Sequence, residues 1–287
     1  MHKREGEFIS MAQISPEVIQ RLIMPVDTNI SLDSVILSDV NREKIQQFLK
    51  ETQHSADLVR YGLKPVNRLL FYGDSGCGKT YLSKALANHL KYTMLYVDIA
   101  NSIATDNVSQ NISTIFAYAN QQKHCIVFLD ECDSIAWNRD AGKNQDSGDI
   151  RRATNTTFQQ LDQMDSTNIA IAATNMLPCL DPAFARRFDD KLEFRRPKTG
   201  LDEIIDKFLF KDKGFVLYHD AAPDYKQVIQ KTIDLSYYTI QLCVERAMKN
   251  AVIAGSLSVS EKDLYDSLAK QMDKFFITPI NDEVQIS

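Results

Sequence analysis

The stretch Gly73-Asp-Ser-Gly-Cys-Gly-Lys79-Thr80 decides the fold, because it fits the pattern G-x-x-x-x-G-K-[ST] of a phosphate-binding loop. The apolar run Arg68–Tyr72 precedes it, and the amphipathic segment Thr80–Leu90 follows it. The order predicts a strand, a glycine-rich loop and a helix. In such a loop, backbone N–H groups and the start of the helix attract phosphate.

The residues of this loop are candidate nucleotide contacts. Lys79 is expected to reach the β- and γ-phosphates of ATP, and the hydroxyl of Thr80 is expected to ligate Mg²⁺. The pattern therefore implies ATP and Mg²⁺ as cofactors. The complete predicted cofactor-binding set is Gly73, Asp74, Ser75, Gly76, Cys77, Gly78, Lys79, Thr80 and Tyr81.

Apolar runs alternate with helical patterns up to about residue 197. The runs Cys125–Leu129 and Ile169–Ala173 lack polar alternation, which is typical of strands buried on both faces of a parallel sheet. Beyond Pro197 the strand signals fade and helical patterns follow, so we place a domain boundary near residue 198. The predicted fold class is α/β, with a parallel P-loop sheet followed by a small all-α domain. Expected strands are 68–72, 93–97, 125–129 and 169–173. Expected helices are a short one at 16–24, one within 38–50 that begins with capping residues, and those at 80–90, 112–120, 151–164, 202–210, 224–233, 239–253 and 261–272.

Polar residues end two of the expected strands, at the edge where open α/β sheets bind ligands. Asp130 suits Mg²⁺ held through water, and Glu131 suits a base that orients the attacking water. Asn175 could hydrogen-bond the attacking water or the γ-phosphate. The alternatives are solvated loop acids for the pair and a turn-forming role for Asn175.

Arg186 and Arg187 follow the last apolar strand. They could complete a phosphate site in trans by neutralising charge in the transition state. The alternative is a surface salt-bridge cluster with Asp189 and Asp190.

The composition narrows the class of protein. The chain has 287 residues, of which 44% are hydrophobic and 25% are charged, as in ordinary globular proteins. No apolar stretch approaches the roughly 20 residues of a membrane span. Five scattered cysteines without CxxC spacing argue against disulfides or zinc and favour the cytoplasm. The net charge of −5 makes a nucleic-acid partner less favourable.

Taken in order, these elements resemble the AAA family of P-loop ATPases within the AAA+ group. Gly73–Thr80 is similar to its Walker A motif, Ile126–Glu131 to Walker B and Ala173–Asn175 to sensor 1. Leu180–Asp189 is similar to the second region of homology, which carries the arginine fingers. The resemblance spans about residues 33–272.

The resemblance implies a ring, usually hexameric, with ATP at subunit interfaces. Arg186 and Arg187 would then reach the γ-phosphate of a neighbour. Hydrolysis would drive pore loops that remodel a protein substrate. The implied domains are an N-terminal segment at 1–32, an AAA+ nucleotide-binding domain at 33–197 and a helical lid domain with a C-terminal tail at 198–287.

The sequence departs from the family pattern at two places, the first pore loop and the arginine finger. Ala104-Thr105-Asp106 stands at the first pore loop without the usual aromatic residue, and Trp137 is the nearest replacement. The Pro-Gly between the two arginines is missing, so either Arg186 or Arg187 could be the finger.

The leading functional hypothesis is Mg²⁺-dependent ATP hydrolysis in a ring, coupled to remodelling, disassembly or activation of a partner protein. One alternative is a nucleic-acid-associated ATPase, such as a replication or transposition helper. Another is an ATP-bound scaffold or switch, against which the presence of Glu131 argues, because a scaffold needs no water-orienting base. Substrate selection is expected to fall to residues 1–32, the pore or a separate partner.

Overall fold

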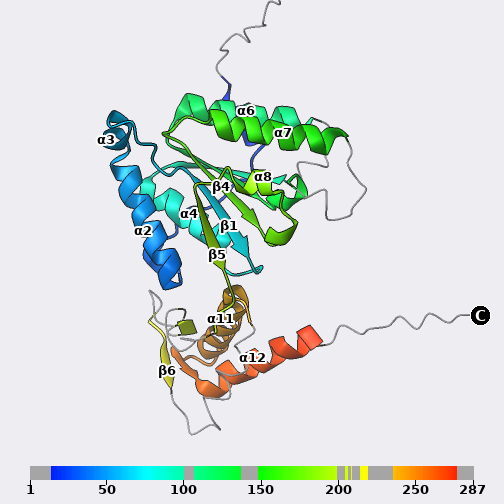
Figure 1. Ribbon diagram of the computed structural model, residues 1–287. Coiled ribbons are helices and arrows are strands. Elements are labelled where there is room, and N and C mark those ends of the chain that lie inside the picture. Colours follow the sequence, from blue (N-terminus) through cyan, green and yellow to red (C-terminus); the bar gives the residue numbers. More distant parts are fainter. Residues whose placement is uncertain are drawn as a thin grey trace, which may run out of the picture. The chain divides into compact units, whose positions relative to one another are not determined.

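The computed structural model describes residues 14–99, 107–136, 148–198, 204, 205, 208, 214–218 and 235–276 (Figure 1). The chain forms two compact units. One consists of Met1–Gly73 and Lys79–Glu193, and the other of Asp74–Gly78 and Phe194–Ser287. The predicted pore-loop residues Ala104–Asp106, the residue Trp137 and the helix expected at 224–233 lie outside the described residues.

The first unit is built on a five-stranded sheet with the order β2-β3-β4-β1-β5. Neighbours in the series β2, β3, β4 and β1 pair in parallel. Every residue of β3 except the last is buried, and every residue of β4 is buried. This burial explains why both sequences lack polar alternation. The predicted α/β fold class is therefore confirmed. The strands are β1 Arg68–Gly73, β2 Thr93–Asp98, β3 Cys125–Asp130, β4 Ile169–Thr174 and β5 Asp190–Phe194.

Helices cover both faces of this sheet. α6 and α7 pack side by side over one face, and α4 lies on the other (Figure 1). The helices of this unit are α1 Pro16–Gln20, α2 Asp39–Gln53, α3 Ser55–Arg60, α4 Lys79–Leu90, α6 Val108–Gln122, α7 Gly148–Gln163 and α8 Pro182–Ala185. Single 3₁₀ turns are η1 Leu32–Ser34, η2 Cys132–Ser134 and η4 Leu177–Cys179.

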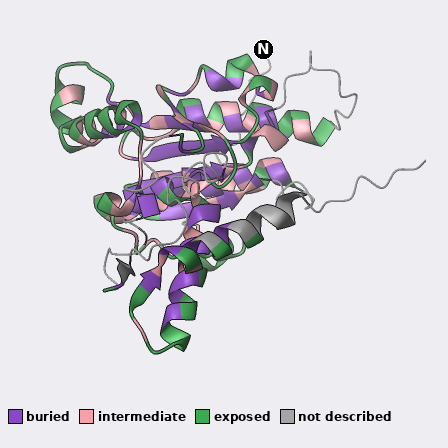
Figure 2. Cartoon of the chain, turned by 90° about the horizontal axis from the view of Figure 1, so that it is seen from below, coloured by how far each residue is buried: buried purple, intermediate pink, exposed green. Residues whose placement is uncertain are grey.

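The core follows from the two-residue period of the strands. Val127 and Leu129 of β3 belong to the same buried cluster as Ile112 and Phe116 of α6. Phe128, between them, points to the opposite face of the sheet, because successive strand residues alternate. Figure 2 shows the buried residues concentrated along the strands and on the inward sides of the helices.

Part of the N-terminal segment packs on the first unit. Ile19 of α1 is 2% exposed and belongs to the buried cluster. The backbone N–H of Met24 donates to the carbonyl of Tyr96 at 2.9 Å, in an antiparallel bridge to β2. β2 is an edge strand, so this bridge occupies part of an otherwise open sheet edge.

The second unit contains α11 Tyr237–Ile253 and α12 Glu261–Phe276. The hydroxyl of Ser260 accepts the N–H of Asp263 at 3.0 Å, so Ser260 caps the start of α12. Two short parallel strands, β6 Val216–Tyr218 and β7 Ser258–Ser260, add to the predicted helices.

The helix expected at 202–210 is described only in part, and the described helices were also compared with the requirements of a membrane span. Residues 204, 205 and 208 of the helix expected at 202–210 are helical. Across the described part of the chain, no helix combines the length and the apolar character that a membrane crossing requires.

Candidate nucleotide site

The carboxyl ends of β1, β3 and β4 lie at one edge of the sheet and carry the candidate residues. The parallel register pairs Tyr72 of β1 with Thr174 of β4. Gly73 therefore ends its strand beside the turn that contains Asn175. At the end of β3, Asp130 pairs in register with Asp98 of β2.

Lys79 lies at the centre of this edge. Its ammonium donates to the carbonyl of Gly73 and to the side-chain oxygen of Asn175, each at 2.7 Å. The residue is 8% exposed, and a buried ammonium requires such partners. A phosphate that contacts Lys79 would therefore lie within reach of Asn175.

The turn after β4 holds Asn175 in place. The hydroxyl of Thr174 donates to the carboxylate of Asp133 at 2.6 Å and accepts the N–H of Met176 at 2.9 Å. These two hydrogen bonds fix the backbone on both sides of Asn175.

Thr80 and Asp130 supply the oxygen ligands that Mg²⁺ prefers. The hydroxyl of Thr80 lies 3.2 Å from Oδ2 of Asp130. Adjacent ligands of an octahedral Mg²⁺ ion, each about 2.0–2.1 Å from the metal, are about 2.9 Å apart. The two side chains therefore fit neighbouring positions around one Mg²⁺ ion. A small protein donor set is usual where nucleotide phosphates supply further ligands.

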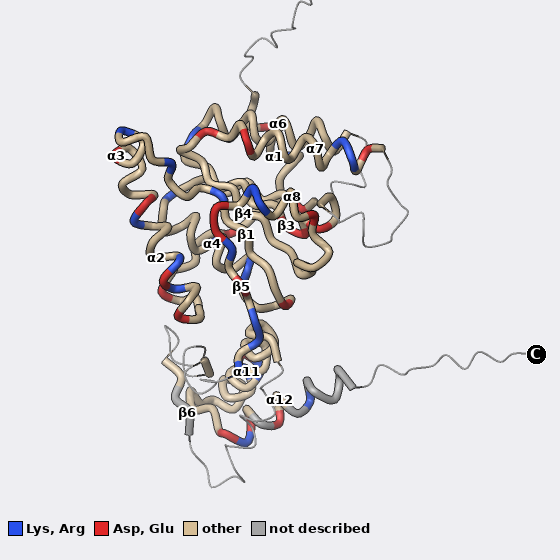
Figure 3. Tube along the Cα trace, in the orientation of Figure 1, with Lys and Arg blue, Asp and Glu red and all other residues tan. Residues whose placement is uncertain are grey.

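Glu131 has an unusual backbone conformation at the end of β3. Its φ of 53° and ψ of 42° are left-handed, which costs a residue other than glycine about 1–2 kcal/mol. Partial burial raises the pKa of Glu131, and the carboxylates of Asp130, Asp98 and Asp133 raise it further. Figure 3 marks the acidic residues that follow β3 in red. A carboxylate in this environment is a stronger base than an ordinary one.

The loop between β1 and α4 depends on glycine. Gly76 and Gly78 have φ values of 71° and 100°, which favour glycine. A Cβ added to Gly76 would lie 2.7 Å from the hydroxyl of Ser236, within the second unit. The carbonyl of Gly76 also accepts the N–H of Tyr238 at 3.1 Å.

The other predicted loop residues have varied surroundings. The backbone N–H of Asp74 donates to the carbonyl of Phe194 at 2.9 Å, and its carboxylate lies 3.8 Å from Arg196. Cys77 is 3% exposed, and its thiol lies 3.8 Å from the carbonyl of Ser75. Tyr81 is half-exposed, with its hydroxyl 3.0 Å from that of Ser34.

The two adjacent arginines have different environments. Arg187 donates to Asp162 at 3.3 Å and to the carbonyl of Ala183 at 2.8 Å. Its guanidinium also lies 4.0 Å from the centre of the Phe158 ring, a cation–π arrangement. Arg186 is exposed, and its side chain makes no hydrogen bond or ion pair within the described residues.

The salt-bridge cluster considered from the sequence is not formed by the arginine pair in the described structure. Asp189 instead pairs with Arg68 at 3.0 Å and also accepts the backbone N–H groups of Asn67 and Arg68. Asp190 pairs with Lys44 at 3.2 Å.

One residue of the site was not predicted. The hydroxyl of Tyr96, on β2, donates to Oδ2 of Asp130 at 2.6 Å. Burial, and secondarily this hydrogen bond, raise the pKa of Tyr96 well above its usual value. The sequence contained only a weak indication that Tyr96 lies near Asp130. Tyr96 and Asp98 share one face of β2, and Asp98 pairs in register with Asp130.

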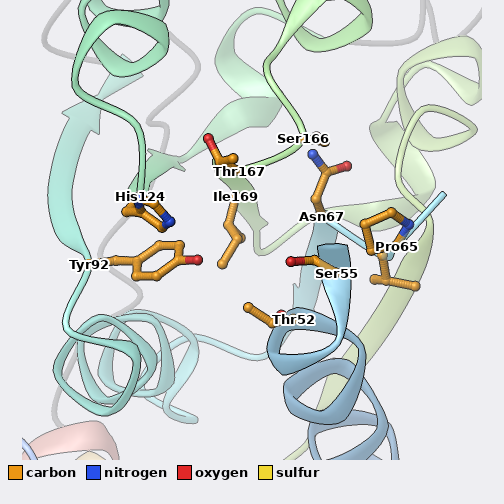
Figure 4. A pocket seen from close by; sticks show the side chains of 10 residues that line it. Thr52, Ser55, Pro65, Asn67, Tyr92, His124, Ser166, Thr167 and Ile169 are labelled. Atoms are coloured by element: carbon orange, nitrogen blue, oxygen red, sulfur yellow. The ribbon is translucent and has the colours of Figure 1, made fainter. Parts of the chain in front are cut away.

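A small pocket lies away from these residues, near the amino ends of the strands (Figure 4). Its volume is about 30 Å³, and Figure 4 shows the rings of Tyr92 and His124 on one side and Asn67 on the other. The two rings pack edge to face with centroids 5.2 Å apart. This volume holds one or two water molecules and not a nucleotide.

Comparison with known proteins identifies the class. Residues 69–196 match the model of the ATPase family associated with various cellular activities (AAA). The chain is 29% identical over 259 residues to the uncharacterized AAA family ATPase y4kL of Sinorhizobium fredii, covering 88% of this chain and 74% of that relative. It is 28% identical over 286 residues to a 26S proteasome regulatory subunit 6B homolog of Encephalitozoon cuniculi, covering 96% of this chain and 72% of that relative.

The matched segment contains both the phosphate-binding loop and the strand that ends in Asp130 and Glu131. The matched domain and the two relatives support an AAA+ P-loop ATPase, an enzyme that hydrolyses ATP. The resemblance seen in the sequence is thereby confirmed.

Proposed function

We propose that this chain hydrolyses Mg·ATP within a ring, most simply a hexamer, and uses the energy to remodel, disassemble or activate a partner protein. The observation that carries the ring is the exposed Arg186, a cation with no side-chain partner in the described structure, on the same chain as an ATP site. A relative named as a proteasome regulatory subunit supports a protein partner.

Each site residue has a proposed role. Lys79 holds the β- and γ-phosphates, and Thr80 and Asp130 hold Mg²⁺, which screens phosphate charge. Glu131 accepts a proton from the attacking water. Asn175, beside Lys79, orients that water or the γ-phosphate. The full proposed cofactor set is the one predicted from the sequence, Gly73 to Tyr81.

We propose Arg186 as the residue that reaches the nucleotide of a neighbouring subunit. Its exposed guanidinium is available to bind a γ-phosphate through two parallel hydrogen bonds. Arg187 would first have to leave Asp162 and the Phe158 ring. Arg187 is therefore assigned to holding the segment in place.

The domain division proposed for this function is an N-terminal segment at 1–32, a nucleotide-binding domain at 33–197 and a lid at 198–287. The cysteines Cys77, Cys125, Cys132, Cys179 and Cys243 are free thiols, which supports a reducing compartment such as the cytoplasm.

The test is Glu131→Gln, which keeps the size of the side chain and removes the base. ATP turnover should fall by about a hundredfold or more, while ATP binding is retained. Because ATP then persists in the site, this variant should retain a partner protein in an ATP-dependent pull-down. The matched control is Lys79→Ala, which should lose ATP binding and hence the partner.

Two results would overturn the proposal. One is ATP turnover that no protein stimulates and that responds to DNA instead, with binding that weakens as salt rises. The formal net charge of −5 favours a protein partner over nucleic acid. The other is Glu131→Gln with normal turnover.

A further inference from the structure

Both carboxylate oxygens of Asp130 accept hydrogen bonds. Its Oδ2 accepts the hydroxyl of Tyr96 at 2.6 Å and that of Thr80 at 3.2 Å. Its Oδ1 lies 3.0 Å from the backbone N–H of Glu131. The carboxylate is therefore restrained at both oxygens, and the shortest of these contacts comes from a residue outside the phosphate-binding motifs.

Tyr96 is itself fixed at several points. Its carbonyl accepts the N–H of Met24 at 2.9 Å, and its ring packs on Phe128 with centroids 5.2 Å apart. A protonated phenol beside a carboxylate acts as the hydrogen-bond donor.

The two hydroxyl groups that donate to Oδ2 of Asp130 would respond differently to a bound cation. The oxygen of Thr80 is itself a proposed Mg²⁺ ligand and would turn toward the metal. Tyr96 has no such role, so its hydrogen bond can persist in the nucleotide-bound enzyme. Groups that orient a metal ligand in this way commonly change metal affinity by 10- to 100-fold when removed.

We propose that Tyr96 is a positioning residue that sets the carboxylate of Asp130 for Mg²⁺. The inference rests on the proposed Mg²⁺ site at Thr80 and Asp130. It assigns to β2 a part in nucleotide binding that neither the sequence motifs nor the relatives' names indicate.

The experiment measures Mg²⁺-dependent nucleotide binding and not turnover. Tyr96→Phe removes one oxygen and keeps the ring that packs on Phe128. Its matched control is Tyr92→Phe, which removes the same atom from the ring beside His124 in the small pocket. Both are made in the Glu131→Gln background, so that a fluorescent ATP analogue is bound and not consumed.

For the parent, binding of the analogue should be tighter in Mg²⁺ than in EDTA. In Tyr96→Phe the Mg²⁺ concentration at half-saturation should rise roughly tenfold, because a hydrogen bond to a charged group is lost. Binding in EDTA should stay unchanged. Tyr92→Phe should behave as the parent in both media.

The possible failures are distinguishable. If the parent binds the analogue equally in Mg²⁺ and EDTA, the Mg²⁺ site itself is wrong. If the parent depends on Mg²⁺ and Tyr96→Phe has the same half-saturation point, the role of Tyr96 is wrong. Equal weakening in both media, with a lower melting temperature, would make Tyr96 a purely structural residue and would also overturn the inference.

Discussion

Arg186 and Arg187 are neighbours in sequence, yet their side chains serve different purposes in the structure. Arg187 contacts Asp162 of α7 and the ring of Phe158, so it joins the segment after α8 to a covering helix. Asp162 also lies 3.8 Å from Arg68 of β1, so Arg187 is part of a wider ionic network.

We therefore expect Arg187→Ala to lower stability. The loss of a partly buried cation–π contact and an ion pair should cost about 1–2 kcal/mol. Thermal melting followed by circular dichroism measures this change. Arg186→Ala is the matched control and should melt as the wild type, since no partner is lost within the described structure. Equal melting of both variants with the wild type would contradict the assigned role of Arg187.

Some residue-level features were predictable and others were not. The loop Gly73–Thr80 carries its chemistry in consecutive residues, so its pattern is visible in the sequence. Tyr96 meets Asp130 only through the register of two parallel strands, and the two residues are 34 positions apart. The sequence also did not predict that Arg187 is paired while Arg186 is exposed. The partners of Arg187, which are Asp162 and Phe158, lie on another helix.

At the scale of elements, apolar runs predicted the four strands β1 to β4 and missed β5, β6 and β7. β3 and β4 are buried on both faces, so their sequences are continuously apolar. β5 has the sequence DKLEF and is only partly buried. Its polar residues make the sequence look like a loop, so no apolar run indicated a strand. β6 and β7 have three residues each, and such strands depend on their pairing more than on local propensity.

The packing of α1 can be tested through one apolar contact. Ile19 is buried and anchors this five-residue helix, which has little stability of its own. Ile19→Ala should weaken the docking of the segment by about 2–5 kcal/mol. Exchange of the Met24 amide hydrogen with solvent should accelerate accordingly.

Val18→Ala provides the control for this measurement. Val18 lies on the same helix and is 46% exposed, so its truncation should leave the Met24 amide protected. Equal acceleration by both substitutions would show that the buried contact of Ile19 is not what holds the segment.

At the scale of the whole molecule, the proposed ring requires that one subunit supplies Glu131 and its neighbour supplies Arg186. Glu131→Gln and Arg186→Ala should each abolish most turnover when assayed alone. Mixing them in equal amounts should restore activity, because some interfaces then combine an intact Glu131 with an intact Arg186. With random assembly about a quarter of the interfaces are complete, which sets the expected activity relative to wild type.

The control for the mixing experiment is Lys79→Ala combined with Glu131→Gln. In that mixture no subunit has both a phosphate-binding lysine and the base, so no activity should return. If Arg186→Ala and Glu131→Gln remain as inactive together as they are separately, Arg186 does not act across an interface.

The antiparallel bridge between Met24 and Tyr96 has a consequence for solubility. β2 ends the sheet, and an exposed strand edge is a template for pairing with another molecule. The N–H of Met24 donates to the carbonyl of Tyr96 on that edge. The docked segment therefore hinders pairing of β2 with a strand of another molecule. Loosening it should therefore promote aggregation before it unfolds the sheet, which light scattering of Ile19→Ala at rising protein concentration would detect.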